Sequence, residues 1–454
     1  MLYGAPMSHL ELPAPIGDIV TAISVQGGRA LIVGGWVRDH LLRIASKDLD
    51  FEVFGLELEA LERVLKKFGR VQRVGKQFGV LRVQGLDVDF SLPRRDNKVG
   101  SGHRGFEIET DPTMAFSDAA LRRDLTINSM GYDPLTGELL DPHGGQADLN
   151  NKVLRATSSN HFAEDPLRGL RAIQFAARFK MRPSEELIKL CHALDLSELP
   201  KERFRTEFDK WFSRGLEPSC GLELLFASGL HRHFPGLSSL EPTSASELGT
   251  RLDAIASMTA LSGTERITLS LATLALFYER SSTDALRDAT PEGENRWHPA
   301  KREASAGAVH LSFLNVIGQP IKSQEQSMRW LHTLEWLQED PSVELQDGEI
   351  RRLATYLHSA NLNLAHWLLG AQASSVVSQA WCETMGQRSS ELGCLHQAQP
   401  DIVQGRDLVK RGLRPGPKFA SLLQACRRLQ DDEGLQDPDD LIDRVLLAKG
   451  QETL

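Results

Sequence analysis

Two adjacent glycines, Gly34 and Gly35, stand between an apolar run and a helical pattern, and they restrict the fold more than any other feature of the chain. Residues 30–33 are all apolar, which predicts a short buried strand, and residues 37–44 predict a helix. Because glycine has no Cβ, backbone amides at such a turn can approach a phosphate closely, and the N-terminus of the next helix faces the anion. We therefore predict a strand, turn and helix that bind phosphate.

A pair of aspartates, Asp48 and Asp50, follows this turn. In residues 48–54 acidic and apolar side chains alternate, as in a half-buried strand. Both carboxylates then point to one face, about 6 to 7 Å apart along the chain. Two Mg²⁺ ions about 3.5 to 4 Å apart could be held by such a pair. A solvated strand face is the alternative for an isolated pair, but the preceding glycine turn favours metal-assisted nucleotidyl transfer.

The composition is that of a large globular protein, and the cysteines indicate that it works in a reducing compartment. The 454 residues are 41% hydrophobic and 25% charged, enough for about two to four domains. The formal net charge of −9 means that any RNA-binding surface must be a local basic patch. The five cysteines form no Cys-x-x-Cys pair, which argues against a zinc site and a disulfide framework. Without an 18-residue apolar stretch or a signal peptide, we predict no membrane span and a cytoplasmic location.

The N-terminal part of the chain predicts a small α/β domain. A helix is expected over residues 56–68, and short strands are expected over residues 71–74, 80–83 and 88–92. Residues 94–112 are rich in glycine and charge, which predicts a long loop without a core.

Beyond residue 154 the pattern is helical almost throughout, with leucine and alanine at helical spacing. Breaks in this pattern fall at residues 235–246, 281–307 and 397–401, where we expect edges of domains or subdomains.

A third acid is expected beside the first two. Asp87 and Asp89 share one face of a strand that could pair with the strand carrying Asp48 and Asp50. A carboxylate there would help to bind the ion that acidifies an attacking 3′-hydroxyl. For either residue alone, a solvated strand edge is the alternative.

The next cluster contains Arg122, Arg123, Asp124 and Asn128. Two consecutive arginines can neutralise a triphosphate, while Asp124 and Asn128, four residues apart on an expected helix, would share a face and could bond a ribose hydroxyl. A carboxylate that accepts from a 2′-hydroxyl selects ribonucleotides. The tripeptide 122–124 taken alone is also common on protein surfaces.

The fourth cluster opens a helix expected to run to about residue 180. Pro166 suits a first helical turn, and Asp165 before it is a plausible N-cap. The functional alternative is that Asp165 accepts and Arg168 donates, since a carboxylate only accepts and a guanidinium only donates. Cytosine and adenine present the complementary amino donor and ring-nitrogen acceptor, whereas guanine and uracil present the reverse. Arg171 could add a donor or form a salt bridge.

In order and spacing these segments resemble the class II tRNA nucleotidyltransferases, or CCA-adding enzymes, and the related bacterial poly(A) polymerases. The resemblance covers residues 28–235 and includes a neck motif at residues 202–208. It implies an α/β nucleotidyltransferase head, DNA polymerase β-like, followed by all-helical neck, body and tail domains. The implied bounds are a catalytic head at 1–153, a base-recognising neck at 154–235, a body at 236–396 and a tRNA-binding tail at 397–454.

The resemblance also implies a role for each matching residue. Asp48, Asp50 and Asp89 would be catalytic, and Asp48 and Asp50 would bind the Mg²⁺ cofactor. The residues implied to bind nucleotide are Gly34, Gly35, Arg38, Arg122, Arg123, Asp124, Asn128, Asp165, Arg168 and Arg171. The neck motif around Glu202 and Arg203 is expected to support the base-reading helix rather than to take part in catalysis.

The implied reaction is template-independent addition of CCA to the 3′ end of tRNA from CTP and ATP. Residues 97–111 form a full-length glycine-rich segment, which favours CCA or A addition over CC addition alone. Residues 405–418 resemble a tail motif, and residues 401–430 hold seven Lys or Arg against two Asp or Glu. We expect a basic patch that binds the tRNA backbone, with a solvated helix pair as the alternative. Its residues are Lys410, Arg411, Arg414 and Lys418.

Alternatives within the same chemistry stay open, because an A-adding tRNA nucleotidyltransferase or a poly(A) polymerase shares every motif. A non-catalytic RNA-binding relative is disfavoured, since a binder has no need of the acid pair. The chain contains no His-Asp dipeptide, so we expect no appended phosphohydrolase activity. Arg43 replaces a glycine usual in the family, which we expect to alter the turn without touching chemistry.

Overall fold

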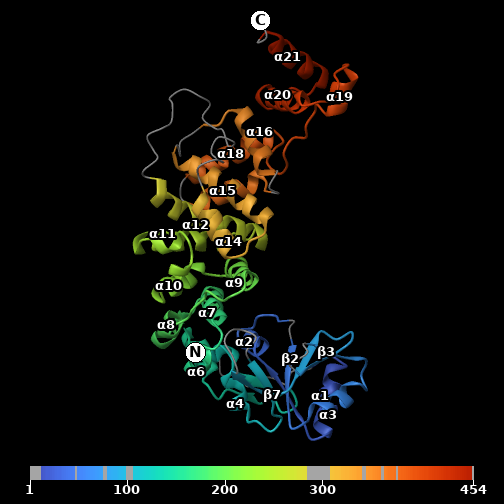
Figure 1. Ribbon diagram of the computed structural model, residues 1–454, viewed down its shortest axis with the longest axis vertical. Helices are drawn as coiled ribbons and strands as arrows, with labels where there is room; N and C mark the ends of the chain where they lie inside the picture. Colours follow the sequence, from blue (N-terminus) through green and yellow to red (C-terminus); the bar gives the residue numbers. More distant parts are fainter. Residues whose placement is uncertain are drawn as a thin grey trace. The chain divides into compact units, whose positions relative to one another are not determined.

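The structure, a computed structural model, divides into two compact units (Figure 1). Unit 1 comprises Met1–Glu207 and Cys220–His233, and unit 2 comprises Phe208–Ser219 and Phe234–Leu454. The residues that the structure describes are 12–46, 49–74, 79–98, 106–283, 307–339, 344–358, 362–374 and 377–451.

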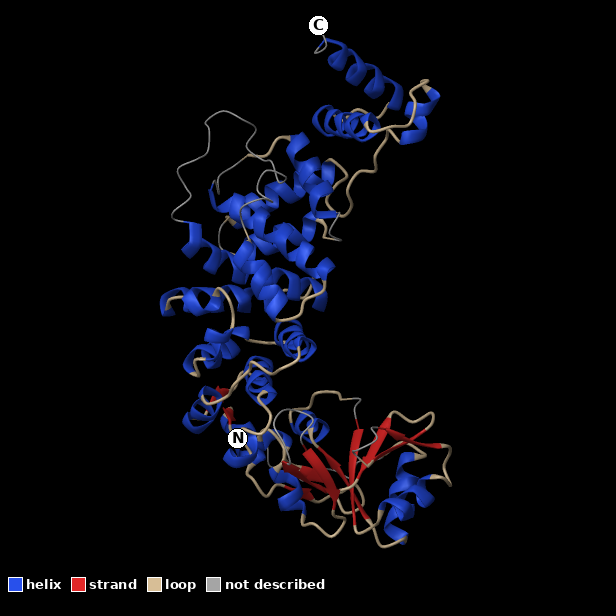
Figure 2. Cartoon of the chain, viewed as in Figure 1, coloured by secondary structure: helices blue, strands red, loops and turns tan. Residues whose placement is uncertain are grey.

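A seven-stranded mixed sheet forms the centre of unit 1 (Figure 2). The strand order is β3-β4-β5-β2-β1-β8-β9, in which β5 and β2 are parallel and the other neighbours antiparallel. The strand bounds are β1 (Arg29–Val33), β2 (Leu49–Phe54), β3 (Val71–Val74), β4 (Val80–Val83), β5 (Val88–Ser91), β8 (Gly131–Tyr132) and β9 (Leu139–Leu140). The α/β head and its expected strands are confirmed.

Helices cover this sheet and continue beyond it. Helix α1 buries Ile16, Ile19, Val20 and Ile23, a 3–4 spacing that gives one apolar face, and it packs against β1 and α3. The bounds are α1 (Ile16–Val25), α2 (Gly35–Leu41), α3 (Leu58–Leu65), α4 (Phe116–Leu121), η1 (Thr126–Asn128), α5 (Gly145–Asn151), α6 (Ser159–Phe162), α7 (Leu167–Phe179), α8 (Glu185–His192), α9 (Lys201–Arg214), α10 (Pro218–Ala227) and η2 (Leu230–His233). One short parallel pair, β10 (Val153–Leu154) with β11 (Arg182–Pro183), interrupts the helical region.

The segment expected to be a long loop is partly a hairpin, so that expectation was wrong. Strands β6 (Arg94–Lys98) and β7 (Phe106–Thr110) pair antiparallel as a separate two-stranded sheet. A two-stranded ladder satisfies its backbone groups without burying apolar side chains, and composition therefore does not reveal it. Residues 99–105 of the glycine-rich segment lie outside the described residues.

The turn after α2 contains a strained residue. Arg43 has φ of 57°, in the left-handed region that glycine adopts freely and other residues adopt at a cost of about 1–2 kcal/mol. Helix α2 ends at Leu41, before the expected end at residue 44. Arg43 therefore adopts a backbone conformation that glycine takes more readily.

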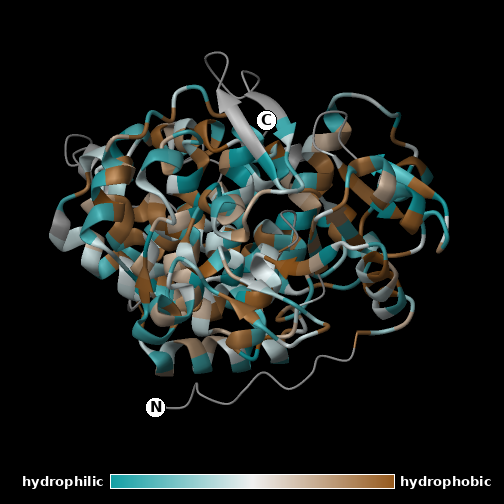
Figure 3. Ribbon diagram, turned by 90° about the horizontal axis from the view of Figure 1, so that it is seen from below, coloured by the Kyte–Doolittle hydropathy of each residue, from teal (hydrophilic) through white to brown (hydrophobic). Residues whose placement is uncertain are grey.

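The regular elements among the described residues of unit 2 are all helices, which confirms the expected fold class. Figure 3 shows hydrophobic and hydrophilic residues interleaved along the helices, as amphipathic packing requires. The bounds are η3 (Leu237–Ser239), α11 (Pro242–Ser257), α12 (Gly263–Thr283), α14 (Ala308–Val316), α15 (Ile321–Glu339), α16 (Asp347–His358), α17 (Leu364–Ala373), α18 (Gln379–Glu391), α19 (Gly405–Lys410), α20 (Lys418–Glu433) and α21 (Pro438–Gln451). None of the described helices has the length and apolar character that a membrane span needs.

The last three helices share a hydrophobic cluster of their own. Its buried members come from α19, α20, α21 and the residues just before them. They are Val403, Leu408, Leu422, Cys426, Leu441, Ile442 and Val445. Such a cluster suits the expected tail, although the division into neck, body and tail stays a prediction.

The cysteines are free thiols, as expected. Four of them are buried and Cys220 is partly buried. Burial raises the pKa of Cys191 to about 12, so this thiol stays protonated and unreactive at neutral pH.

A buried polar network joins three helices of unit 2. The fully buried imidazole of His310, on α14, contacts the Tyr278 hydroxyl through Nδ1, and its Nε2 lies 2.8 Å from the Ser327 hydroxyl. The backbone N–H of His310 donates to Glu279 at 2.8 Å. Burial, and to a smaller extent the nearby His332, lower the pKa of His310 to about 3. The imidazole is therefore neutral in the folded protein at neutral pH.

Acid should destabilise unit 2 through His310. The pKa of this group is 6.5 without the fold and about 3 within it, so the unfolded chain takes up the proton first as the pH falls. The contribution of the neutral His310 to the unfolding free energy is complete above pH 6.5 and is lost progressively as the pH falls towards 3. Between pH 7 and 5.5 the wild type should lose about 1 kcal/mol more unfolding free energy than His310→Gln in urea titrations. Equal losses in both proteins would contradict this.

Candidate active site

Asp50 and Asp89 lie side by side on the two central parallel strands. The register of β2 and β5 pairs Asp50 with Asp89. Paired residues on neighbouring strands, which are about 4.8 Å apart, point to the same face. The expected pairing of the two acid-bearing strands is therefore present, and the register places Asp89 directly beside Asp50, whereas Asp87 precedes β5. Asp48 lies outside the described residues, so its position stays a prediction.

Arg82 neutralises Asp89 from the neighbouring strand β4. Its Nε and Nη2 donate to the two carboxylate oxygens at 2.6 and 2.8 Å. Both side chains are partly exposed, at 41% for Arg82 and 28% for Asp89. Ion pairs this exposed contribute little to stability, so Asp89 is oriented but remains available to a stronger cation.

The glycine turn lies against Arg123. Gly34 has φ of 76° and ψ of −134°, and a Cβ built there would lie 3.0 Å from Arg123 Nη1. Helix α2 begins at Gly35, and the N–H of Gly34 donates to the Met130 carbonyl at 3.4 Å. Two segments that the sequence singled out separately thus meet at the end of β1.

Glu52 holds both predicted triphosphate arginines, and sequence analysis assigned it no role. This residue of β2 is fully buried; Arg122 Nη2 lies 2.5 Å from Oε1, and Arg123 Nη2 lies 3.6 Å from Oε2. Burial raises the pKa of Glu52, but the charges of Arg123 and Arg122 together lower it below its ordinary value. The alternation of acidic and apolar residues could have indicated a role for Glu52, because Glu52 follows Asp50 by two residues and so lies on the same strand face.

Asp124 accepts hydrogen bonds from three donors. They are the Leu125 N–H at 2.8 Å, Asn128 Nδ2 at 2.9 Å and Arg171 Nε at 2.6 Å. Burial raises the pKa of Asp124, but the Arg171 charge and these hydrogen bonds bring it below its ordinary value, so the group is ionised. The expected contact with Asn128 is present. The expectation of a helix across both residues was wrong. Leu125 is extended, and the 3₁₀ turn η1 brings Asn128 back towards Asp124.

Arg38 lies in the interior of unit 1, with 4% of its surface exposed. Its Nε and Nη2 donate to Asp39 at 2.8 and 2.6 Å, and its Nη1 donates to Asn128 at 2.5 Å. The guanidinium also lies over the Phe175 and Phe179 rings of α7, at 5.1 and 4.6 Å from the centroids. Arg38 therefore orients the Asn128 amide, while its contact with nucleotide stays a prediction.

Two arginines of α7, two helical turns apart, fasten this helix to the preceding elements. Arg171 donates to Asp124 at 2.6 Å, and Arg178 donates to Asp39 at 3.4 Å. With the contacts of Arg38, hydrogen bonds connect Arg178 to Arg171 through side chains outside α7. In order, these are Asp39, Arg38, Asn128 and Asp124. Of the two possibilities open for Arg171, the structure shows the salt bridge.

Asp165 and Arg168 lie at the start of α7, and each has protein partners. Asp165 Oδ1 accepts from the Leu167 N–H at 3.1 Å, which is a helix-capping contact, and Oδ2 accepts from Arg203 Nη2 at 3.0 Å. Arg168 Nη2 donates to the Arg122 carbonyl at 2.6 Å. Arg203 of α9 thus supports the start of α7, as the resemblance implied, and the bonds of Arg168 tie this pair to the two-arginine segment.

The predicted RNA-binding residues are exposed on α19, on the turn after it and at the start of α20. Arg411 is not free, because it forms ion pairs with Asp439 at 3.1 Å and Asp443 at 2.9 Å on α21. Lys410 pairs with Asp407 at 3.3 Å within its own helix. Acids beyond residue 430 therefore offset part of the positive charge counted in the sequence.

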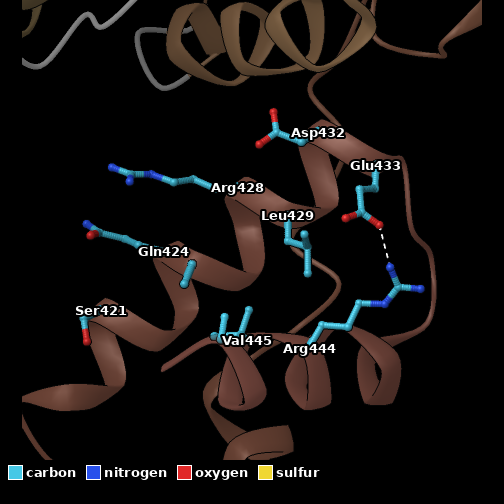
Figure 4. Close-up of a pocket in the computed structure, with 10 residues that line it drawn as sticks. Ser421, Gln424, Arg428, Leu429, Asp432, Glu433, Arg444 and Val445 are labelled. Atoms are coloured by element: carbon cyan, nitrogen blue, oxygen red, sulfur yellow. Dashed lines mark hydrogen bonds and ion pairs between the residues drawn. The ribbon is translucent and has the colours of Figure 1, made fainter. Parts of the chain in front are cut away.

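A cavity of about 540 Å³ lies between α20 and α21 (Figure 4). Leu429 and Val445 line it together with the ion pair between Glu433 and Arg444, whose atoms are 2.7 Å apart. The side chains of Arg428 and Gln424 extend from α20 beside it. None of the four predicted RNA-binding residues lines this cavity, so the two features are separate.

Comparisons with family models identify two segments of the chain. Residues 30–155 match the model described as "Poly A polymerase head domain". Residues 182–240 match the one described as "Probable RNA and SrmB- binding site of polymerase A". These two segments are therefore similar to the head domain and to the probable RNA-binding site of poly(A) polymerases, which confirms the resemblance drawn from the motifs.

Curated relatives share this part of the chain. A "Multifunctional CCA protein" of Haemophilus ducreyi is 38% identical over 186 residues, which are 39% of this chain and 44% of that protein. One of Neisseria meningitidis serogroup A is 39% identical over 183 residues, which are 39% of this chain and 42% of that protein. The match thus spans less than half the length of these relatives.

Solved structures share the fold over nearly the whole chain. The "Bacillus stearothermophilus CCA-adding enzyme in complex with CTP" has a TM-score of 0.68 at 19% identity, covering 97% of this chain and 99% of that one. The "Thermotoga maritima CCA-adding enzyme complexed with tRNA_CCA" has a TM-score of 0.59 at 19% identity, covering 96% of each. These matches confirm the predicted fold class.

The backbone at Gly34 and the nearby Arg123 should both disfavour a larger residue at this position. Gly34→Ala adds a Cβ at a φ of 76° and a ψ of −134°, 3.0 Å from Arg123 Nη1, whereas Gly144→Ala adds one at the same φ but a ψ of 25°, with no atom within 4 Å. A left-handed α alanine, as at Gly144, costs about 1–2 kcal/mol, and residues with a Cβ adopt the conformation of Gly34 still more rarely. We expect Gly34→Ala to lower the unfolding free energy of unit 1 by at least about 1 kcal/mol more than Gly144→Ala. Equal losses in urea titrations would show that neither the backbone at Gly34 nor the contact with Arg123 imposes an additional constraint.

Proposed function

We propose that this chain is a tRNA nucleotidyltransferase that adds CCA to the 3′ end of tRNA from CTP and ATP without a template. The observation that carries the proposal is one strand, β2, that presents Asp50 beside Asp89 and, two residues on, Glu52 with its two arginines. A cation site and a triphosphate site thus adjoin on one face of the sheet. The names of the relatives and of the structural neighbours support the same reaction.

Divalent cations suit the acidic side of this site. Asp50 and Asp89 offer carboxylate oxygens from adjacent strands, and hard cations such as Mg²⁺ prefer oxygen ligands. Asp48 would complete the set. Two bound Mg²⁺ ions would supply acidification of the 3′-hydroxyl and neutralisation of charge on the leaving pyrophosphate. For Asp89 to serve, Arg82 releases its exposed ion pair, which costs little.

The residues of the chain then act by positioning and charge neutralisation. The 3′-hydroxyl of the tRNA attacks the α-phosphate in line, and pyrophosphate leaves. Arg122 and Arg123 hold the triphosphate beside the glycine turn. Asp124, kept ionised by Arg171, accepts from a ribose hydroxyl, and Arg38 orients the amide of Asn128 for the same sugar.

Base selection falls to the start of α7. Asp165 accepts and Arg168 donates, a pattern that matches cytosine and adenine. Arg203 and the main-chain carbonyl of Arg122 hold the two side chains in place, so the protein surface replaces a template. The exposed basic residues of the tail, Lys410, Arg411, Arg414 and Lys418, would bind the tRNA backbone in the cytoplasm, where free thiols persist.

The reaction can be tested with tRNA that lacks its terminal CCA and with each labelled nucleotide supplied separately. We expect CTP to be incorporated on the bare end, ATP only on ends that carry CC, and neither GTP nor UTP. The second candidate is an A-adding enzyme or poly(A) polymerase, which the description of the matched head domain favours. Incorporation of ATP without CTP would establish that candidate instead, onto the bare end for a poly(A) polymerase and only onto ends that carry CC for an A-adding enzyme.

Loss of one metal-binding acid should abolish turnover but not RNA binding. Asp50→Asn removes the charge that faces the cations, and several kcal/mol of transition-state stabilisation, or about a thousandfold in kcat, should be lost. Asp87→Asn is the matched control, because Asp87 is exposed and lies just before β5. Nucleotide incorporation and tRNA filter binding would measure both. Retained incorporation in Asp50→Asn would refute the assignment of Asp50.

A further inference from the structure

We propose that Glu52 is a positioning residue that holds Arg122 and Arg123 ready for the triphosphate and keeps them away from the metal-binding acids. The proposal rests on the proposed function and deepens it. Glu52 touches no reacting group, and the family resemblance assigned it no role. Its geometry nevertheless places it between the acidic and basic halves of the site.

The position of Glu52 on the sheet is the first argument. It lies on β2, paired with Leu31 of β1 on one side and with Ser91 of β5 on the other. Its side chain therefore shares a face with Asp50, about 6–7 Å along the strand. A fully buried carboxylate is tolerated only with strong partners, and Glu52 has both arginines.

The charges at Glu52 do not balance, which is the second argument. Two guanidinium groups face one carboxylate, so a surplus positive charge remains in a site where each arginine side chain is 19% exposed. Among the described atoms, Arg122 Nε and Arg123 Nε are buried without a hydrogen-bond partner, so Glu52 does not satisfy every donor of the two arginines. A triphosphate would supply the missing negative charge.

The proximity of Arg123 to Asp50 is the third argument. Burial lowers the pKa of Arg123, and the charges of Glu52, Asp124 and Asp50 act against that lowering. If Glu52 were neutral, Asp124 and Asp50 would be the anions left near Arg123, and Asp124 already pairs with Arg171 at 2.6 Å. An arginine on Asp50 would compete with the cation, as Arg82 already does at Asp89. Glu52 therefore separates the half of the site that binds cations from the half that binds anions.

A purely structural role for Glu52 is less consistent with the packing. Helix α4, which leads into the two arginines, already has its own anchor on the sheet. Phe116 packs edge-on against Phe54 at 6.1 Å, and its ring lies so close to Gly131 that a Cβ there would be 2.6 Å away. The placement of α4 thus does not depend on the Glu52 ion pairs.

Glu52→Gln in the full chain tests the proposal, because glutamine keeps the shape and removes the charge. The KM for CTP and ATP should rise about 10- to 100-fold, the loss expected for one charge-assisted contact, while kcat falls less than about threefold. Without tRNA, the variant should bind CTP and CMP with nearly equal affinity, whereas the wild type should prefer CTP strongly. Mn²⁺ affinity, measured by electron paramagnetic resonance, should also fall.

Two further variants separate this role from general destabilisation. Asp133→Asn neutralises another buried carboxylate of the same sheet, which pairs with Arg29 at 2.8 Å, and it should leave the KM and the preference for CTP over CMP unchanged. Glu52→Asp keeps the charge and should restore much of that preference, and it also serves if Glu52→Gln does not fold.

The outcomes distinguish the two proposals. A wild type that incorporates no nucleotide would overturn the proposed function. An active wild type with an unchanged KM in Glu52→Gln would overturn the role of Glu52. Equal weakening of CTP and CMP binding would do the same, because it would show a structural effect only.

Discussion

The parallel register of β2 and β5 is the constraint on which the rest of the site depends. It sets Asp50 beside Asp89, and the two-residue period of β2 then places Glu52 on the same face. A slip of one residue would turn all of these side chains to the opposite face, where Phe51 and Phe90 stack in the core at 5.2 Å. The apolar packing of that opposite face therefore enforces the register. Burial of two phenylalanines on one side of the sheet thus determines the chemistry on the other.

Helix α7 links the parts of the site that would bind ribose and base. It is fastened through Arg171 to Asp124 and through Arg178 to Asp39, and the side chain of Arg38 completes the connection through Asn128. The proposed acceptor for a ribose hydroxyl is thus oriented by the helix at whose start Asp165 and Arg168, the pair proposed to read the base, are located. A shift of α7 would therefore disturb both proposed functions together.

Several charged groups of the described site have a protein partner before any ligand arrives. Arg82 pairs with Asp89, Arg203 pairs with Asp165, and the two-arginine segment pairs with Glu52. We therefore expect a cation to replace the ion pair at Asp89 and a triphosphate to add negative charge beside the two arginines, which outnumber their one carboxylate. The net charge of −9 says little about the site, because the relevant charges are local.

The sequence by itself determined the α/β head, the helical remainder and the glycine turn, because strand and helix periodicity and short spacings are local properties. Tertiary structure decided that the strands carrying Asp50 and Asp89, which the sequence only suggested could pair, do pair in register. It alone decided that Glu52 holds an arginine 70 residues away, that Arg38 is buried, and that an extended residue and a 3₁₀ turn, not a helix, join Asp124 to Asn128. It also decided that residues 94–98 and 106–110 pair as strands. Contacts between residues so far apart in the sequence depend on which elements pack together, and the local sequence pattern between the two residues does not determine that packing.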